Sequence, residues 1–329
     1  MRSLTARRRL ALAFALLGVL AAAPAAAQDN WPSRPLRLIV PFPAGSFTDT
    51  VARAVADGLA KGLGQPVVVD NKAGANGVLG ATEAARAAPD GYTLMVTNSS
   101  SVTINPQIYK KAAYKAADFT PVTMVLEAPF VLAANADWAQ KNGVGTLAQL
   151  VDHMRRNPGQ LSYGSAGPGN IAHLSFALLG NRSGTKAAHI PYKSAAAAQL
   201  ALLSGELHAS FDTLTAVPHI QSGKLKALAV TSTRRVPQLP EVPTMEQAGY
   251  PDVSVSFWIG LLVPAGTPAA IVQRMHAATI AALDDPKARA TLAAQGELVL
   301  LEPGAYGRRV EREVASWGAV IQREAISAD

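Results

Sequence analysis

The sequence predicts an α/β protein with two domains around a ligand cleft, joined by two crossing segments. Apolar segments typical of strands alternate with helix-like segments from residue 36 onward, the pattern of β-α-β units in a largely parallel sheet. Two longer apolar stretches, 121–134 and 253–263, enclose the middle of the chain and are expected to cross between the domains. The length of 329 residues also suits two domains.

The first 27 residues have the pattern of a signal peptide rather than of a membrane span. Arg2 and three further arginines precede an apolar run at 10–23, and Ala25-Ala26-Ala27 offers a small-x-small cleavage site. The run is alanine-rich and shorter than the ~20 strongly apolar residues that a span requires. We therefore expect cleavage near Ala27 and an exported, periplasmic protein that begins at Gln28.

Composition excludes several classes of protein. Removing the predicted signal peptide takes away four arginines and no acid, which lowers the formal net charge from +7 to +3. The remaining lysines and arginines are scattered, so no nucleic-acid partner is expected. The chain has no cysteine, which excludes disulfides, thiolate metal sites and a cysteine nucleophile.

The elements of the first domain follow from apolar periodicity and turn residues. At 48–63, Val51, Val55 and Leu59 fall on one helix face, and Thr48 or Asp49 can cap the helix. Turn residues then separate the later segments. The expected strands are 36–40, 66–70 and 92–97, and the expected helices are 48–63 and 78–87.

The second domain and the returning chain follow from the same signals. Asn157-Pro158-Gly159 ends one helix and Ser204-Gly205 ends another. The expected strands are 160–164, 189–192, 207–212 and 225–231, and the expected helices are 146–156, 170–179, 195–203 and 215–222. After the return, helices are expected at 268–283, at 287–295 and from near Gly304. The expected domains are 28–126 plus 254–329, and 127–253.

Four loops at the carboxyl ends of predicted strands are rich in small polar residues. A helix N-terminus offers unpaired N–H groups and the positive end of a dipole, and glycines let the backbone approach a ligand closely. Together the loops predict a pocket for a small carboxylate between the two sheets. For any single loop, helix capping and turn formation are the alternative. The loops are Gly45–Asp49, Asn98–Ser101, Ser165–Asn170 and Asp212–Thr213.

Residues that carry catalysis in other proteins lack the required spacing in this chain. Gly164-Ser165-Ala166-Gly167 departs from the G-x-S-x-G of a nucleophile elbow, and the six histidines show no tight metal spacing. Asp49 and Asp212 can be imagined as an acid–base pair, with capping or loop anchoring as the alternative. We expect no enzyme, no catalytic residues, no metal and no cofactor.

Nine segments, in order, resemble the Bug-type extracytoplasmic solute receptors, the TctC-like binding proteins of tripartite tricarboxylate transporters. They are VPFPAGSFTD, VVVDNKAGANGVLGA, AAPDGYTL, LSYGSAGPGNIAHL, HIPYKSAAAA, SFDTL, PHIQSGKLKALAVTS, VPTMEQAG and GLLVPAGTP, within residues 31–326. The resemblance implies a periplasmic binding protein type II-like fold that closes on its ligand like a Venus flytrap. It implies capture of a small organic carboxylate, aliphatic or aromatic, and delivery to the subunits of a tripartite tricarboxylate-type membrane transporter.

The same resemblance implies which residues bind the ligand. By motif they are Ser46, Phe47, Thr48, Asp49, Asn98, Ser99, Ser165, Ala166, Gly169, Asn170, His173, Asp212 and Thr213. The implied binding uses backbone N–H groups and small hydroxyls, with two ordered waters bridging the ligand to the first loop. The chain is expected to be a monomer. A receptor that docks on a sensor kinase, and an exported hydrolase, are the alternative functions.

The first loop departs from the pattern of these receptors. The usual P-A-G-G-x-x-D becomes Pro43-Ala44-Gly45-Ser46-Phe47-Thr48-Asp49, which adds a hydroxyl and an aromatic ring. We therefore expect an altered two-water bridge. Two hypotheses for Phe47 stay open: its ring packs against an aromatic or apolar ligand, or it folds back onto the first domain's core.

Overall fold

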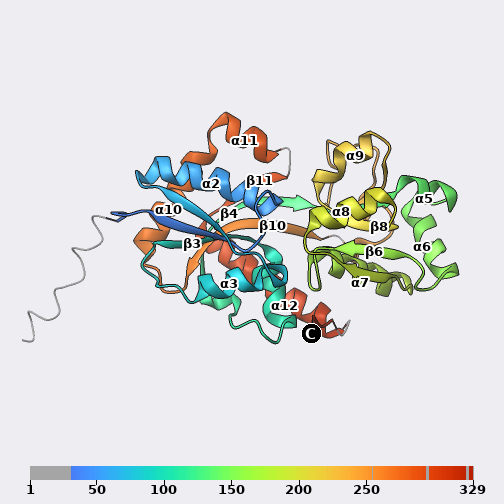
Figure 1. Ribbon diagram of the computed structural model, residues 1–329, viewed down its shortest axis with the longest axis horizontal. Helices are drawn as coiled ribbons and strands as arrows, with labels where there is room; N and C mark the ends of the chain where they lie inside the picture. The colour runs from blue at the N-terminus through green and yellow to red at the C-terminus, as the bar shows by residue number, and fades with distance from the viewer. Residues whose placement is uncertain (1–30, 254, 294–295, 324–325, 329) are drawn as a thin grey trace, which may run out of the picture.

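The computed structural model describes residues 31–253, 255–293, 296–323 and 326–328. It shows two α/β lobes side by side, each built on its own sheet (Figure 1). The predicted signal peptide, 1–27, lies outside the described residues. Within the described part of the chain, no helix combines the length and the apolar character needed to cross a membrane.

The first lobe contains a six-stranded sheet with the order β11-β4-β10-β3-β1-β2. The strand β1 is parallel to β2 and β3, whereas β10 runs antiparallel to β3 and β4. This mixed sheet confirms the predicted α/β class. The strands are β1 Leu36–Val40, β2 Val67–Asn71, β3 Thr93–Asn98, β4 Phe119–Pro129, β10 Ser256–Pro264 and β11 Glu297–Leu301.

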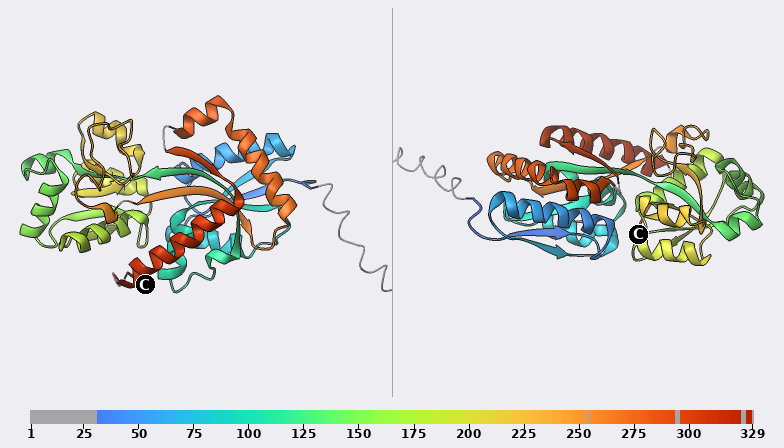
Figure 2. Two further views of the ribbon diagram at one scale, coloured as in Figure 1. Left: turned by 180° about the vertical axis from the view of Figure 1, so that it is seen from behind. Right: turned by 90° about the horizontal axis from the view of Figure 1, so that it is seen from above.

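Helices cover both faces of this sheet (Figure 2). Successive residues of β1 point to opposite faces, so Leu38 joins the core beneath α2 and α10 while Ile39 joins the core beneath α3 and α12. Because both faces are buried, the strands are almost continuously apolar. The helices are α2 Phe47–Leu63, α3 Val78–Ala85, α4 Asn105–Ile108, α10 Ala269–Leu283, α11 Pro286–Ala293 and α12 Pro303–Arg323.

The second lobe contains a five-stranded sheet with the order β7-β6-β8-β5-β9. The strand β6 is parallel to β7 and β8, and β5 is antiparallel to β8 and β9. The strands are β5 Val131–Asn135, β6 Ser162–Ser165, β7 Ala188–Pro191, β8 Ala209–Asp212 and β9 Leu225–Val230. The helices are α5 Ala136–Lys141, α6 Leu147–Arg156, α7 Ile171–Ser183, α8 Ala195–Ser204 and α9 Val217–Gln221.

Two passages join the lobes. The apolar stretch at 121–134 is two strands rather than one, because β4 pairs in the first sheet, β5 pairs in the second, and Phe130 lies between them. After β9 the chain stays on the second lobe, where Val236 and Leu239 join the core and Thr244 pairs with Val230, and it then enters β10 at Ser256. Because β4 continues to Pro129, the first passage lies a few residues after the predicted domain boundary at 126. The domain boundaries stay a proposal.

Several local predictions need correction. The cap of α2 is Ser46 rather than Thr48 or Asp49, because the N–H of Asp49 donates to Ser46 Oγ. The predicted polar loop at 98–101 is the end of β3 followed by a π-helical turn, Ser100–Ile104. The strand β11 and the short helix α5 were not predicted.

Candidate ligand-binding site

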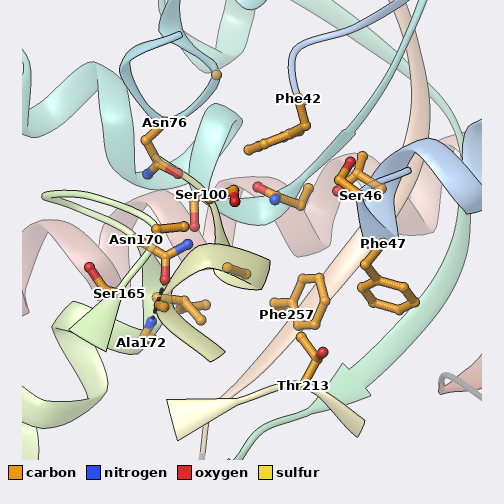
Figure 3. Close-up of a pocket in the computed structure, with 18 of the residues that line it drawn as sticks. Phe42, Ser46, Phe47, Asn76, Ser100, Ser165, Asn170, Ala172, Thr213 and Phe257 are labelled. Atoms are coloured by element: carbon orange, nitrogen blue, oxygen red, sulfur yellow. Dashed lines mark hydrogen bonds between the residues drawn. The ribbon is translucent and has the colours of Figure 1, made fainter. Parts of the chain in front are cut away.

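A pocket of about 130 Å³ lies between the two lobes, lined by residues from both sheets (Figure 3). This volume is below the ~300 Å³ at the lower end of ordinary ligand pockets, so it suits a small molecule. Residues of the first lobe and its passages that line it are Pro41–Pro43, Ser46–Thr48, Ala73–Gly77, Asn98, Ser100, Phe130 and Phe257. Those of the second lobe are Ser165, Ala166, Asn170–Ala172, Lys193–Ala195, Ala198 and Ser210–Thr213.

The topology explains why these residues meet. Each lobe contributes three mutually parallel strands, β1, β2 and β3 in one and β6, β7 and β8 in the other. The loop after each of these six strands supplies residues to the pocket. Carboxyl ends of parallel strands share one edge of a sheet, where ligands of open α/β sheets bind.

The N-termini of four helices also reach the pocket. Lining residues lie at the starts of α2, α3, α7 and α8. Side-chain caps define three of these starts: Asn170 Oδ1 accepts from Ala172 N–H at 3.0 Å, Ser194 Oγ from Ala197 N–H at 3.2 Å, and Ser46 Oγ from Asp49 N–H at 3.2 Å. The positive ends of the helix dipoles therefore converge on one small volume, which favours an anion.

Asp49 fixes the shape of the first loop and does not line the pocket. Its buried carboxylate accepts hydrogen bonds from Gly45 N–H at 2.8 Å, from Asn71 Nδ2 at 2.9 Å and from Arg53 Nε at 2.8 Å. Burial alone would raise the pKa of Asp49, but these donors together hold that pKa below its usual value. Asp49 is therefore an ionised anchor of the loop.

The same loop accommodates Ser46 at the position where the resemblance to these receptors implies a second glycine. Gly45 has φ +76°, a left-handed conformation that favours glycine. Ser46 has φ −67° and ψ 161°, which any residue adopts, and its hydroxyl caps α2. The backbone at this position therefore accepts serine without strain.

Phe47 lies along the pocket and also packs against the protein. Its ring meets the ring of Phe257 edge-on, with centroids 5.4 Å apart and planes at 68°. Phe257 in turn packs against Phe130, with centroids 5.1 Å apart. We call Phe47, Phe130 and Phe257 the phenylalanine wall. Both hypotheses for Phe47 thus retain support, because one ring contacts the core and borders the pocket.

The loop after β6 is supported by a pair of stacked histidines. His189 Nε2 lies 2.6 Å from Ser165 Oγ, and the rings of His173 and His189 stack with centroids 4.1 Å apart. His173 Nδ1 accepts from Gly169 N–H at 3.2 Å. Burial lowers the pKa of His173, and burial together with the charge of His173 lowers the pKa of His189 to about 4. The pair is therefore neutral at pH 7.

Gly169 and its neighbours join the two lobes beside the pocket. Gly169 has φ +73°, and a Cβ there would come within 1.9 Å of Ile108 Cδ1 in the first lobe. Next to it, Tyr109 Oη donates to the Pro168 carbonyl at 2.6 Å. This hydrogen bond links the lobes and is made only when they lie close together.

Charged groups are scarce in the lining. Lys193, which is exposed, and Asp212, which is buried, are its two charged residues. Asp212 Oδ1 accepts from Thr213 N–H at 2.7 Å, and Oδ2 accepts from Gln199 Nε2 at 2.9 Å. Burial nevertheless raises the pKa of Asp212 to about 6.

Uncharged polar groups of the first lobe complete the pocket. The side-chain oxygens of Asn76 and Asn98 are buried and have no hydrogen-bond partner, although both residues line the cavity. A buried polar atom without a partner is costly unless water or a ligand pairs with it. No group of three histidine, aspartate or glutamate residues that could hold a metal ion occurs among the described residues.

The structure brings most of the predicted site residues together. Those that line the pocket are Ser46, Phe47, Thr48, Asn98, Ser165, Ala166, Asn170, Asp212 and Thr213. Asp49, Gly169 and His173 support the loops from outside the lining, and Ser99 is fully buried and does not line the pocket.

Sequence reasoning missed other lining residues. They include Ala73–Gly77, Phe130, Lys193–Ala195, Ala198 and Phe257. Two of these groups carried the same signal as the predicted loops, since Ala73–Gly77 follows β2 and Lys193-Ser194 lies between β7 and α8. Phe130 and Phe257 carried no local signal, because only the tertiary structure brings the two passages to the pocket.

Comparison with known proteins assigns the family. Residues 51–326 match the family described as tripartite tricarboxylate transporter family receptor. The chain is 37% identical to BugT of Bordetella pertussis over 305 residues, which cover 92% of each protein. It superimposes on MatC of Rhodopseudomonas palustris with bound malate at a TM-score of 0.81 and 34% identity, covering 88% of this chain and all of MatC.

A second R. palustris protein, solved with adipate, gives a TM-score of 0.82 at 31% identity and covers 90% of this chain and 99% of its own. The match of family, relatives and structures agrees with the pocket geometry described above. The chain therefore belongs to the tripartite tricarboxylate transporter receptor family and is a Bug-type, TctC-like receptor with two α/β domains.

Proposed function

We propose that the protein captures a small organic carboxylate in the pocket between its lobes and delivers it to a tripartite tricarboxylate-type membrane transporter. The observation that supports this most strongly is the convergence of four helix N-termini on one pocket whose lining carries no arginine. A carboxylate there is bound by backbone N–H groups and small polar side chains rather than by a counter-charge.

Closure of the lobes makes such binding favourable. Because each lobe supplies helix N-termini, bringing the lobes together surrounds the anion and excludes water. Hydrogen bonds to a charged group contribute ~1.5–3 kcal/mol each in such an environment. The Tyr109–Pro168 hydrogen bond then stabilises the closed arrangement.

The relatives support both the ligand class and the location. MatC and the second R. palustris structure carry malate and adipate, which are carboxylates. Receptors of this family are periplasmic, which agrees with the signal peptide predicted at 1–27. Delivery to a transporter is tested by uptake of the identified acid, which should require both this protein and the transporter subunits. A receptor that only docks on a sensor kinase would leave uptake unchanged.

A binding panel tests the proposed function directly. Purified protein is titrated with aliphatic mono-, di- and tricarboxylates, amino acids and aromatic acids, and each acid that binds is compared with its amide. A ligand at 100 times its Kd stabilises the fold by ~2.7 kcal/mol, which a thermal shift detects. We expect an acid to bind and its amide to bind far more weakly. The proposal would be contradicted if no acid binds to protein that mass spectrometry has shown to be free of ligand.

A matched pair of variants locates the anion. Ala166 lines the pocket and is only partly buried, so a longer side chain there can extend into the cavity. Ala166→Glu and Ala166→Gln add nearly the same volume, but only glutamate adds negative charge. We expect Glu to weaken acid binding at least ~10-fold more than Gln, since like charges in a dry site repel strongly. Equal losses would place the anion elsewhere.

The neighbouring serine and histidine are not arranged for hydrolysis. Ser165 Oγ lies 3.0 Å from the Gly167 carbonyl, a second acceptor to which its hydroxyl can donate in place of His189. Within the described chain, His189 has no carboxylate partner, although a catalytic triad requires one. We expect no turnover of an ester panel. Turnover that Ser165→Ala abolishes would instead favour an exported hydrolase.

A further inference from the structure

The pocket has two unlike sides. Figure 3 shows Phe42, Phe47 and Phe257 on one side and Asn76, Asn170 and Ser165 on the other. The phenylalanine wall belongs to the aromatic side, and its members Phe130 and Phe257 are almost fully buried. A ligand with one polar end and one apolar end matches this division.

The polar side can hold one carboxylate. The N-terminus of α7 begins there at Asn170, and its first backbone N–H groups can donate hydrogen bonds to a carboxylate. The N-terminus of α8, with Ser194 as its cap, also lines the pocket. The backbone N–H groups at these two helix starts give a single anion several hydrogen-bond donors without any arginine.

The aromatic side offers poor surroundings for a second carboxylate. It has two labelled hydroxyl groups, Ser46 and Thr213, and each already accepts one hydrogen bond, from Asp49 N–H and from Thr215 N–H. Each therefore has only its single O–H donor to offer a carboxylate. The other labelled side chains there are the rings of Phe42, Phe47 and Phe257. An ionised carboxylate buried against rings, without hydrogen bonds, is strongly disfavoured.

The charged residues of the lining also favour a ligand with a single negative charge. Asp212 is buried in the second-lobe wall, and its carboxyl group already accepts two hydrogen bonds. Lys193 is the lining's one cation, and it is exposed. A ligand with two or three negative charges would meet an acid and no buried cation, so a single negative charge is favoured.

We propose that the ligand is a monocarboxylate with an apolar aromatic body, seated with its carboxylate at the start of α7 and its ring against the phenylalanine wall. This inference rests on the proposed function and specifies the ligand class within it. The ring of Phe47 is only partly buried, and its edge-on contact with Phe257 leaves part of its surface to the pocket. Aromatic pairs favour such edge-on and offset arrangements.

Calorimetric titration with three probes tests the inference. Benzoate carries one charge and a ring, butyrate one charge and a short chain, and malate two charges and no ring. We expect benzoate to bind at least ~10-fold tighter than either of the others. Tighter binding of malate than of benzoate would overturn the inference and leave the proposed function intact. Failure of all three probes and of the wider acid panel would overturn the proposed function itself.

Two variants test whether the phenylalanine wall contacts the aromatic ring of the ligand. Phe47→Leu keeps an apolar side chain but removes the aromatic ring, and it should weaken benzoate binding ~3–10-fold while changing butyrate binding less than ~2-fold. Leu200→Ala, an exposed apolar residue outside the pocket, serves as the control and should change neither. Equal losses for benzoate and butyrate in Phe47→Leu would overturn the assignment of the ring to the phenylalanine wall.

Discussion

Replacing Asp49 by alanine should destabilise the protein and disorganise its pocket. The side chain of Asp49 is 2% exposed and binds three donors, whereas its partner Arg53 is 53% exposed. The exposed ion pair contributes ~0–1 kcal/mol. The bonds from Gly45 N–H and Asn71 Nδ2 to a charged acceptor contribute ~1.5–3 kcal/mol each and are not additive. We therefore expect Asp49→Ala to cost about 3 kcal/mol, near the lower end for breaking a buried polar network.

Urea unfolding followed by tryptophan fluorescence measures this loss, and calorimetry should show a fall in Tm of ~6–12 °C. Arg53→Ala is the matched control, since it removes the same ion pair from its exposed side and should cost no more than ~1 kcal/mol. Acid binding by Asp49→Ala should also weaken, because the loop that carries Ser46 and Phe47 loses its anchor. The reasoning is refuted if Asp49→Ala is as stable as the parent, or if Arg53→Ala is equally destabilising.

Three further predictions concern the link between the lobes and the buried titratable groups. Tyr109→Phe removes a hydrogen bond between the lobes worth ~0.5–1.5 kcal/mol, so stopped-flow dissociation of the bound acid should accelerate ~2–10-fold; an unchanged rate would contradict its role in closure. The pKa of Asp212 is raised to about 6, so ligand-free stability should fall by ~3 kcal/mol as pH rises from about 4 through 6. The stability of Asp212→Asn, measured by denaturation, should not show this fall between pH 4 and 6. A pH profile identical to that of the parent would refute the assignment to Asp212. The pKa of His189 is lowered to about 4, so between pH 6.5 and 4 the unfolded chain binds a proton there that the folded protein does not, and the parent loses stability as pH falls. His189→Gln should lose less stability than the parent over that range. A steeper loss in the variant would contradict the assignment.

The sequence predicted the repeated β-α units well because each unit carries its own local signals. The strands β1 and β6 end in loops of glycine, proline and small polar residues, and helices such as α2 and α7 begin at polar caps. It missed β11, a short edge strand beside β4, and α5, a helix of six residues. Elements this short depend more on tertiary contacts than on their own periodicity.

The sequence predicted which loops form the site, because the order of parallel strands determines which loops lie together. Loops after neighbouring parallel strands must meet at one edge, so Ser46, Asn98, Ser165 and Asp212 could be grouped from the order of strands and loops along the chain. The direction of each side chain could not be predicted. Whether Asp49 faces the ligand or the loop depends on Asn71, on another strand, and the surroundings of Phe47 depend on Phe257, which lies far along the chain.

The most direct test of the account is a crystal structure of the protein with the acid from the panel that binds most tightly. The account predicts the carboxylate of that acid at the start of α7, between the two lobes and within hydrogen-bonding distance of backbone N–H groups there. A ligand found elsewhere would contradict it, for example in the separate cavity lined by Thr231, Arg235 and Glu297. So would a ligand in the pocket whose carboxylate faces the phenylalanine wall.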